Sequence, residues 1–173
     1  LVALEVVGVV AVRHGDGAVL TDASGSAKVL DALRAHAKRL PDIIDARDAL
    51  ETKIAALAAS RRTDDDLTAI DGALDVMEAD IEAGGRGVEG DELFHAAITA
   101  AAHSSLLEKM MHEISELILE TRIESLSQPG RPRDSLSAHR RIADAIRLGD
   151  PDLAAAAMHH HVAQVSDVAI LRD

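Results

Sequence analysis

Apolar residues recur at spacings of three and four along most of this chain, a pattern that places them on one face of successive α-helices. Pro41, Thr63 and Pro151 mark helix starts, and Gly149 marks a helix end. We therefore expect helices at 26–40, 42–60, 63–83, 89–103, 104–126, 134–148 and 151–170. Short connections between them predict an all-α fold, an antiparallel bundle of about seven helices.

The first 22 residues follow a different pattern, in which two short β-prone runs flank a turn. The runs are Val9 to Val12 and Ala18 to Leu20, and the turn is Arg13-His14-Gly15-Asp16-Gly17, which together predict a β-hairpin. A two-stranded ribbon is barely stable alone, so we expect this piece to belong to a larger domain that is mostly absent. The lack of an initiator Met agrees with a chain that begins within a domain. A polar linker, Thr21 to Ser26, follows.

Composition narrows the class of protein. Apolar residues make up 47% of the chain, yet it has one Phe and no Tyr or Trp, which favours close-packed helices over a β-sandwich. The formal net charge of −12 argues against nucleic-acid binding by this segment alone. The absence of Cys excludes thiolate metal sites, and no apolar run reaches the roughly 20 residues that span a bilayer. We expect a soluble, cytoplasmic protein without membrane partners.

Four polar residues interrupt the apolar stripes of three predicted helices: Asp91, His95, His139 and His161. Burying a polar group without a partner costs roughly 2–7 kcal/mol, so something must satisfy these side chains inside a bundle. A divalent cation would satisfy all four together. Such nitrogen and oxygen ligands suit Zn²⁺, which we favour, and also Mn²⁺, Ni²⁺ or Fe²⁺. Within the tract His159-His160-His161, only one side chain can face the core, and the stripe selects His161.

Two arginines also fall on apolar stripes. Arg47 lies in line with Ile43 and Leu50, and Arg122 follows Ile118 at helical spacing. An arginine directed into a bundle needs a carboxylate or a phosphate, which its planar guanidinium binds with two hydrogen bonds. For Arg47 that partner is either a bound acid or Glu51, one helical turn later.

These residues alone leave three classes of protein open. The first is a protein that binds a divalent metal without catalysis, the second is a helical metalloenzyme (hydrolase or isomerase) using the same three His and one Asp, and the third is a structural bundle with internally paired histidines. Metal-assisted hydrolysis needs a positioned general base, and no unassigned acid or His is marked out for that role. Glu92-x-x-His95 matches half of a di-iron motif, but the second half is missing.

An ordered set of motifs resembles one family along nearly the whole bundle, from about Val29 to Val165. The motifs are Asp45-Ala-Arg47-Asp-Ala-Leu50-Glu51, Ala58-Ala-Ser-Arg61-Arg-Thr63-x-x-Asp66-Leu67, Asp91-Glu-Leu-Phe94-His95, Ser127-Gln-Pro-Gly-Arg131, His139-x-x-Ile142-x-x-Ala145-Ile146-x-x-Gly149-Asp150 and Ala157-Met158-x-x-His161. They resemble the ligand-binding FCD domain of GntR-type bacterial transcription regulators of the FadR subfamily. Residues 4–17 are similar to the end of the recognition helix and the wing of that family's winged helix-turn-helix.

The resemblance implies a role for each of these residues. Asp91, His95, His139 and His161 would bind a divalent metal, and a small carboxylate effector would complete its coordination, with Arg47 holding the acid group. Arg122 and Ser104 would lie on the effector side of the pocket, where family members often carry Asn in place of Ser104. Presence of the metal residues favours a metal-dependent acid sensor over the acyl-CoA-binding variant of the family.

The resemblance also divides the chain. It implies a remnant of the winged helix-turn-helix at 1–22, a linker at 23–28 and an effector- and metal-binding domain at 29–170. Arg13, His14 and Gly15 of the wing would contact operator DNA, and the regulator would act as a homodimer. A hydroxy acid or a sugar acid is the expected effector, because a carboxylate with an adjacent hydroxyl can chelate a metal.

Overall fold

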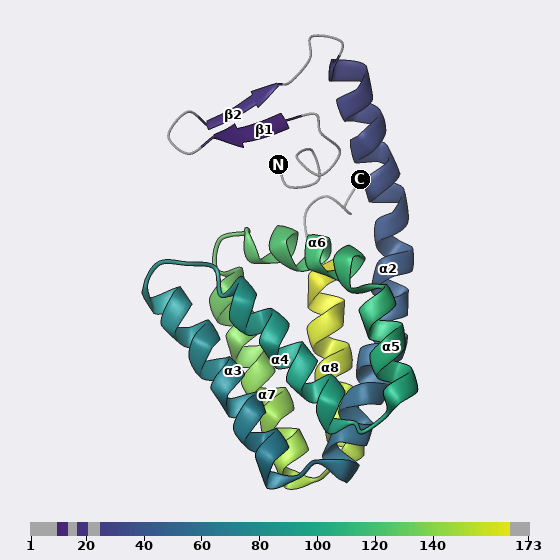
Figure 1. Ribbon diagram of the computed structural model, residues 1–173, viewed down its shortest axis with the longest axis vertical. Helices are drawn as coiled ribbons and strands as arrows, with labels where there is room; N and C mark the ends of the chain where they lie inside the picture. Colours follow the sequence, from purple (N-terminus) through teal and green to yellow (C-terminus); the bar gives the residue numbers. More distant parts are fainter. Residues whose placement is uncertain (1–9, 14–16, 21–24, 167–173) are drawn as a thin grey trace.

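The computed structural model describes residues 10–13, 17–20 and 25–166, and the side chains of residues 40–164. Two short strands, β1 (Val10–Arg13) and β2 (Gly17–Leu20), precede the helices. The helices are α2 (Gly25–Arg61), α3 (Asp64–Glu82), α4 (Val88–Ala101), α5 (Ser105–Glu113), α6 (Ser115–Leu126), α7 (Arg131–Leu148) and α8 (Pro151–Ser166). The all-helical bundle predicted from the sequence is present (Figure 1).

The two strands pair antiparallel, with Val10 opposite Leu20 and Arg13 opposite Gly17. Most of the predicted turn between them, including His14 and Gly15, lies outside the described residues. The assignment of these strands to the wing of a DNA-binding domain therefore stays a prediction.

The number of helices agrees with the sequence prediction, but several of their boundaries do not. The predicted helices 26–40 and 42–60 form one helix, α2, with Pro41 inside it. An interior proline costs a helix about 3 kcal/mol because it lacks an N–H and crowds the preceding turn. Leu40 and Ile43, on either side of Pro41, are buried, and their packing favours continuing the helix through this position.

The single helix predicted at 104–126 is also wrong, because the chain breaks at Ile114 (φ −105°, ψ 5°) into α5 and α6. No Gly or Pro stands at the break, so the local sequence does not mark it. At the other end of the following loop, α7 begins at Arg131, three residues before its predicted start, with Pro132 in its first turn where no N–H is needed.

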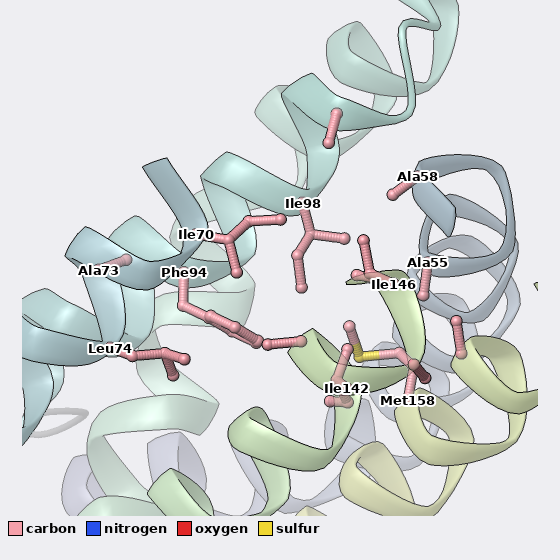
Figure 2. Packing of buried hydrophobic residues seen from close by; sticks show 14 of the residues in the cluster. Ala55, Ala58, Ile70, Ala73, Leu74, Phe94, Ile98, Ile142, Ile146 and Met158 are labelled. Carbon is pink, nitrogen blue, oxygen red and sulfur yellow. The ribbon is translucent and has the colours of Figure 1, made fainter. Parts of the chain in front are cut away.

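The core lies between α2, α3, α4, α7 and α8 (Figure 1). Figure 2 shows how Ile70, Phe94, Ile98, Ile142 and Met158 converge from four of these helices. Alanines such as Ala55 and Ala58 line α2 where it packs against α8, and their small side chains allow the two helices to approach closely. The tight packing holds α4, α7 and α8 in a fixed relation, which positions the polar residues on their inner faces.

Local signals in the sequence explain several helix ends. Thr63 caps α3 in a reciprocal capping box with Asp66, and Gly149 ends α7 in the left-handed conformation (φ 72°). None of the helices in the described ranges combines the length and apolar character needed to cross a bilayer.

Candidate metal centre

Three helices bring Asp91, His95, His139 and His161 together in the interior. Asp91 and His95 lie one turn apart on α4, His139 lies on α7 and His161 on α8. All four residues are buried, and none is more than 4% exposed. One potential ligand atom from each lies within 4.8 Å of those from the other three. The four residues that the sequence singled out therefore form one cluster.

Two distances within the cluster are close to those between neighbouring ligands of one metal ion. The Nε2 atoms of His139 and His161 are 3.2 Å apart, and Nε2 of His139 lies 3.5 Å from Oδ1 of Asp91. Two ligands at about 2.0–2.1 Å from a tetrahedral zinc ion are separated by about 3.3 Å. Two imidazole nitrogens that face each other in a dry interior need either one shared proton or one shared cation.

Glu51, on α2, contacts the ring nitrogen of His95 that faces away from the cluster. Its Oε2 atom lies 2.6 Å from Nδ1 of His95, and both side chains are buried. This contact favours the tautomer with hydrogen on Nδ1, which leaves the lone pair of Nε2 directed at the cluster. Nε2 of His95 has no hydrogen-bond partner among the described residues. A carboxylate that holds a histidine in this way is common around bound metal ions.

Burial sets the protonation of the cluster. Desolvation lowers the pKa of His139 to about 3, and it also lowers the pKa values of His95 and His161. Burial raises the pKa of the Asp91 carboxyl, but the nearby His139 and Arg122 outweigh it and the net shift is downward. Three neutral imidazoles and one carboxylate therefore face each other at neutral pH, and this is the protonation state in which they bind a divalent ion.

The two arginines are buried beside the cluster, and each is paired with an acid. Nε of Arg47 lies 2.7 Å from Oε1 of Glu51, and Nε of Arg122 lies 3.1 Å from Oδ2 of Asp91. The internal Arg47–Glu51 pair considered from the sequence is thus present. It does not occupy the whole guanidinium, because the Nη2 atom of Arg47 has no partner among the described residues.

Two cavities adjoin the cluster, with Arg122 lining both. The smaller, about 10 Å³, has room for roughly one water-sized group and is lined by Arg47, Asp91, Arg122, Ser125, Leu126, Arg131, Ser135 and His161. The larger, about 220 Å³, lies between α4, α5 and α6 and includes His95 in its wall. Ser104 lies at the start of α5 and lines neither of these cavities.

The remaining predicted site residues belong to the N-terminal segment. Arg13 is the last residue of β1, and His14 and Gly15 lie outside the described residues. The sequence did not point to Ser125, Ser135 or Arg131 beside the cluster. Ser135 precedes His139 by one helical turn, so its place on the same stripe was available as a clue.

Comparison with known proteins places this site in a family. The FCD domain matches residues 42–164, which is more than half of the chain. The chain belongs to the FCD-domain family of GntR-type transcriptional regulators. The matched stretch of the FCD domain includes Arg47, Glu51 and Arg122 as well as the four clustered residues.

The relatives of this FCD-domain chain are regulators. It is 33% identical over 177 residues to the HTH-type transcriptional regulator LutR of Bacillus subtilis, with 97% of this chain and 80% of LutR covered. It is 34% identical over 117 residues to the Uxu operon transcriptional regulator of Escherichia coli, with 65% and 46% covered. A solved structure of Streptococcus agalactiae GntR superposes with a TM-score of 0.63 at 26% identity, with 94% and 76% covered. The chain is therefore a regulator, and the alternative of a metalloenzyme is set aside.

Proposed function

We propose that this regulator senses a small hydroxy acid or sugar acid through a divalent metal ion bound by Asp91, His95, His139 and His161. The proposal is carried by one observation: four buried ligand atoms from three helices lie within 4.8 Å of one another. Left alone, this arrangement buries the Nε2 atom of His95 without a partner and places the Nε2 atoms of His139 and His161 3.2 Å apart. A bound cation would offset that cost by direct ligation of the cluster.

The charges around the cluster favour an acidic effector. Arg47 and Arg122 contribute +2 and Glu51 and Asp91 contribute −2, so the set is neutral before a divalent ion binds and carries +2 afterwards. A buried positive charge of this size favours an anion. The spare Nη2 atom of Arg47 and the guanidinium of Arg122 are suited to a carboxylate, which a hydroxyl on the adjacent carbon would help to chelate to the metal.

In this proposal, the linker transmits effector binding from the helical domain to the DNA-binding domain. Residues 29–170 form the effector- and metal-binding domain, 23–28 the linker, and 1–22 the end of a winged helix-turn-helix whose Arg13, His14 and Gly15 contact operator DNA. Two copies act as a homodimer. The effector shifts the arrangement of the two wings only by its differential affinity for two states of the dimer, typically 1–3 kcal/mol.

Metal analysis with a matched control tests the proposal. Purified wild type is expected to contain close to one divalent ion per chain, and the His139→Ala/His161→Ala variant to contain none above background. His159→Ala/His160→Ala removes two imidazoles from the same helix and is expected to keep the metal, because both of these side chains are exposed. Circular dichroism verifies that each variant is helical.

Calorimetry with glycolate, the smallest hydroxy acid, tests the sensing step. Glycolate is expected to bind the metal-loaded wild type and to lose its affinity after chelation of the metal. Wild type without metal, or unchanged metal in the His139→Ala/His161→Ala variant, would contradict the metal site. Equal glycolate affinity with and without metal would contradict sensing through the ion.

A further inference from the structure

We infer that the 220 Å³ cavity between α4, α5 and α6 binds the tail of the effector, and that Glu92 and Glu108 at this cavity select an uncharged hydroxylated tail over a second carboxylate. This inference rests on the proposed function, since it assumes that the acid group of the effector lies at the metal and Arg122. It adds the chemistry of the opposite end of the ligand.

The body of an effector needs more room than the cluster offers. The cavity beside Asp91 and His161 has a volume of about 10 Å³, which suits one carboxylate oxygen or one water. The other cavity that Arg122 lines has about 220 Å³, roughly twenty times that volume. A chain of a few hydroxylated carbons fits that space.

The two cavities share one residue that would hold the acid group. Arg122, which is 9% exposed, lines both of them. His95, which is 4% exposed, lines the larger cavity, and its Nε2 atom has no partner. A ligand whose carboxylate lies between the metal and Arg122 would therefore extend its remaining atoms past His95 into the larger cavity.

Two exposed carboxylates line this cavity. Glu92 from α4 and Glu108 from α5 line it, together with the neutral hydrogen-bonding groups of Thr99 and Ser115 and the imidazole of His112. Carboxylates accept hydrogen bonds from hydroxyl groups and repel other carboxylates, so hydroxyls on the tail are favoured here and a terminal acid is disfavoured. Arg122, the one arginine or lysine among the described residues that line the cavity, is paired with Asp91.

Two six-carbon acids provide a matched pair of probes. Gluconate ends in a hydroxymethyl group and glucarate ends in a second carboxylate, while the rest of their carbon chains are the same length. Calorimetry on the metal-loaded full chain at pH 8 is expected to give at least tenfold tighter binding of gluconate. In the Glu92→Gln/Glu108→Gln variant the ratio is expected to fall to threefold or less.

The control variant is Glu89→Gln/Glu113→Gln. It removes the same number of charges from the same two helices at exposed positions that do not line the cavity, and it is expected to keep the wild-type ratio. A change of ratio in this control equal to that of the Glu92→Gln/Glu108→Gln variant would overturn the inference, because a general charge effect would then explain it.

Glycolate, which has no tail, separates the inference from the proposed function. If glycolate binds in a metal-dependent way but gluconate and glucarate bind equally well, the tail site is wrong and the metal-dependent sensor stands. If neither glycolate nor gluconate binds the metal-loaded protein, both the tail site and the acid sensor are wrong.

Discussion

The carboxylate of Glu51 contacts the ring of His95, with Oε2 of Glu51 2.6 Å from Nδ1 of His95. The same carboxylate contacts Nε of Arg47 through Oε1, at 2.7 Å. Glu51 thus connects a proposed metal ligand on α4 with a proposed effector-binding residue on α2. Burial raises the pKa of the Glu51 carboxyl, but Arg47 and His95 outweigh it and hold that pKa well below its usual range, so this side chain is an anion.

Replacing Glu51 with Gln is expected to weaken metal binding by about 10- to 100-fold, the range seen when the partner of a metal-binding histidine is removed. The amide of Gln keeps the size of the side chain but loses the charge that makes His95 a stronger ligand. Competition with a chelator measures the affinity. Glu82→Gln, an exposed acid on α3, is the control and is expected to bind metal as wild type does. A helical Glu51→Gln protein with unchanged metal affinity would contradict this role.

Much of this site could be predicted from the sequence because its residues break a periodic pattern. His139 lies on the same helix face as Leu136, Ala143 and Ile146. This apolar face predicts that the histidine is buried. Glu51 was considered only as the partner of Arg47, because its position one turn later on the same helix shows that contact and no other. Its contact with His95 depends on how α2 packs against α4, which periodicity does not specify.

The helix boundaries, too, can be predicted only where a local sequence signal marks them. Helices bounded by Thr63, Gly149 and Pro151 begin or end within a residue of these local signals. Two predictions from local signals are wrong. A helix continues through Pro41, where the sequence predicts a helix start, and the chain breaks at Ile114, where the sequence predicts a continuous helix. At Pro41, the packing of the buried Leu40 and Ile43 overrides local propensity, whereas no local signal in the sequence marks the break at Ile114.

Two glycines in neighbouring helices are expected to respond oppositely to substitution by alanine. A Cβ at Gly90, on α4, would overlap the backbone of Met77 on α3, whereas a Cβ at Gly72, on α3, meets nothing. Gly72→Ala is expected to raise the free energy of unfolding by about 0.5–1 kcal/mol, because alanine favours the helix. Gly90→Ala is expected to lower it by about 1–3 kcal/mol, the usual cost of overpacking. Urea denaturation measures both, and a Gly90→Ala protein as stable as wild type would show that α3 and α4 do not approach so closely.

The stability of the metal-free protein is expected to fall as the pH is lowered from 7.5 to 5. Burial lowers the pKa of His139 to about 3, whereas a histidine in the unfolded chain has a pKa of about 6.5. Between these values the unfolded chain takes up a proton that the folded chain does not, so acid favours unfolding.

His139 alone is expected to contribute a loss of about 2 kcal/mol by pH 5. His95 and His161 act in the same direction, since their pKa values are also lowered. Asp91 and Glu51 do not contribute in this range, because their pKa values are shifted below ordinary values that already lie near 4.

Urea titrations in the presence of a chelator, repeated at several pH values, measure this dependence. His139→Leu is expected to reduce the slope of the unfolding free energy against pH by about 1.4 kcal/mol per pH unit, the contribution of one proton, between pH 6 and 5. His159→Ala/His160→Ala is expected to keep the wild-type slope, since both of these side chains are exposed. A wild-type slope in the His139→Leu protein would mean that His139 is protonated in the folded state, and a protonated imidazole at this position could not bind a metal ion through Nε2.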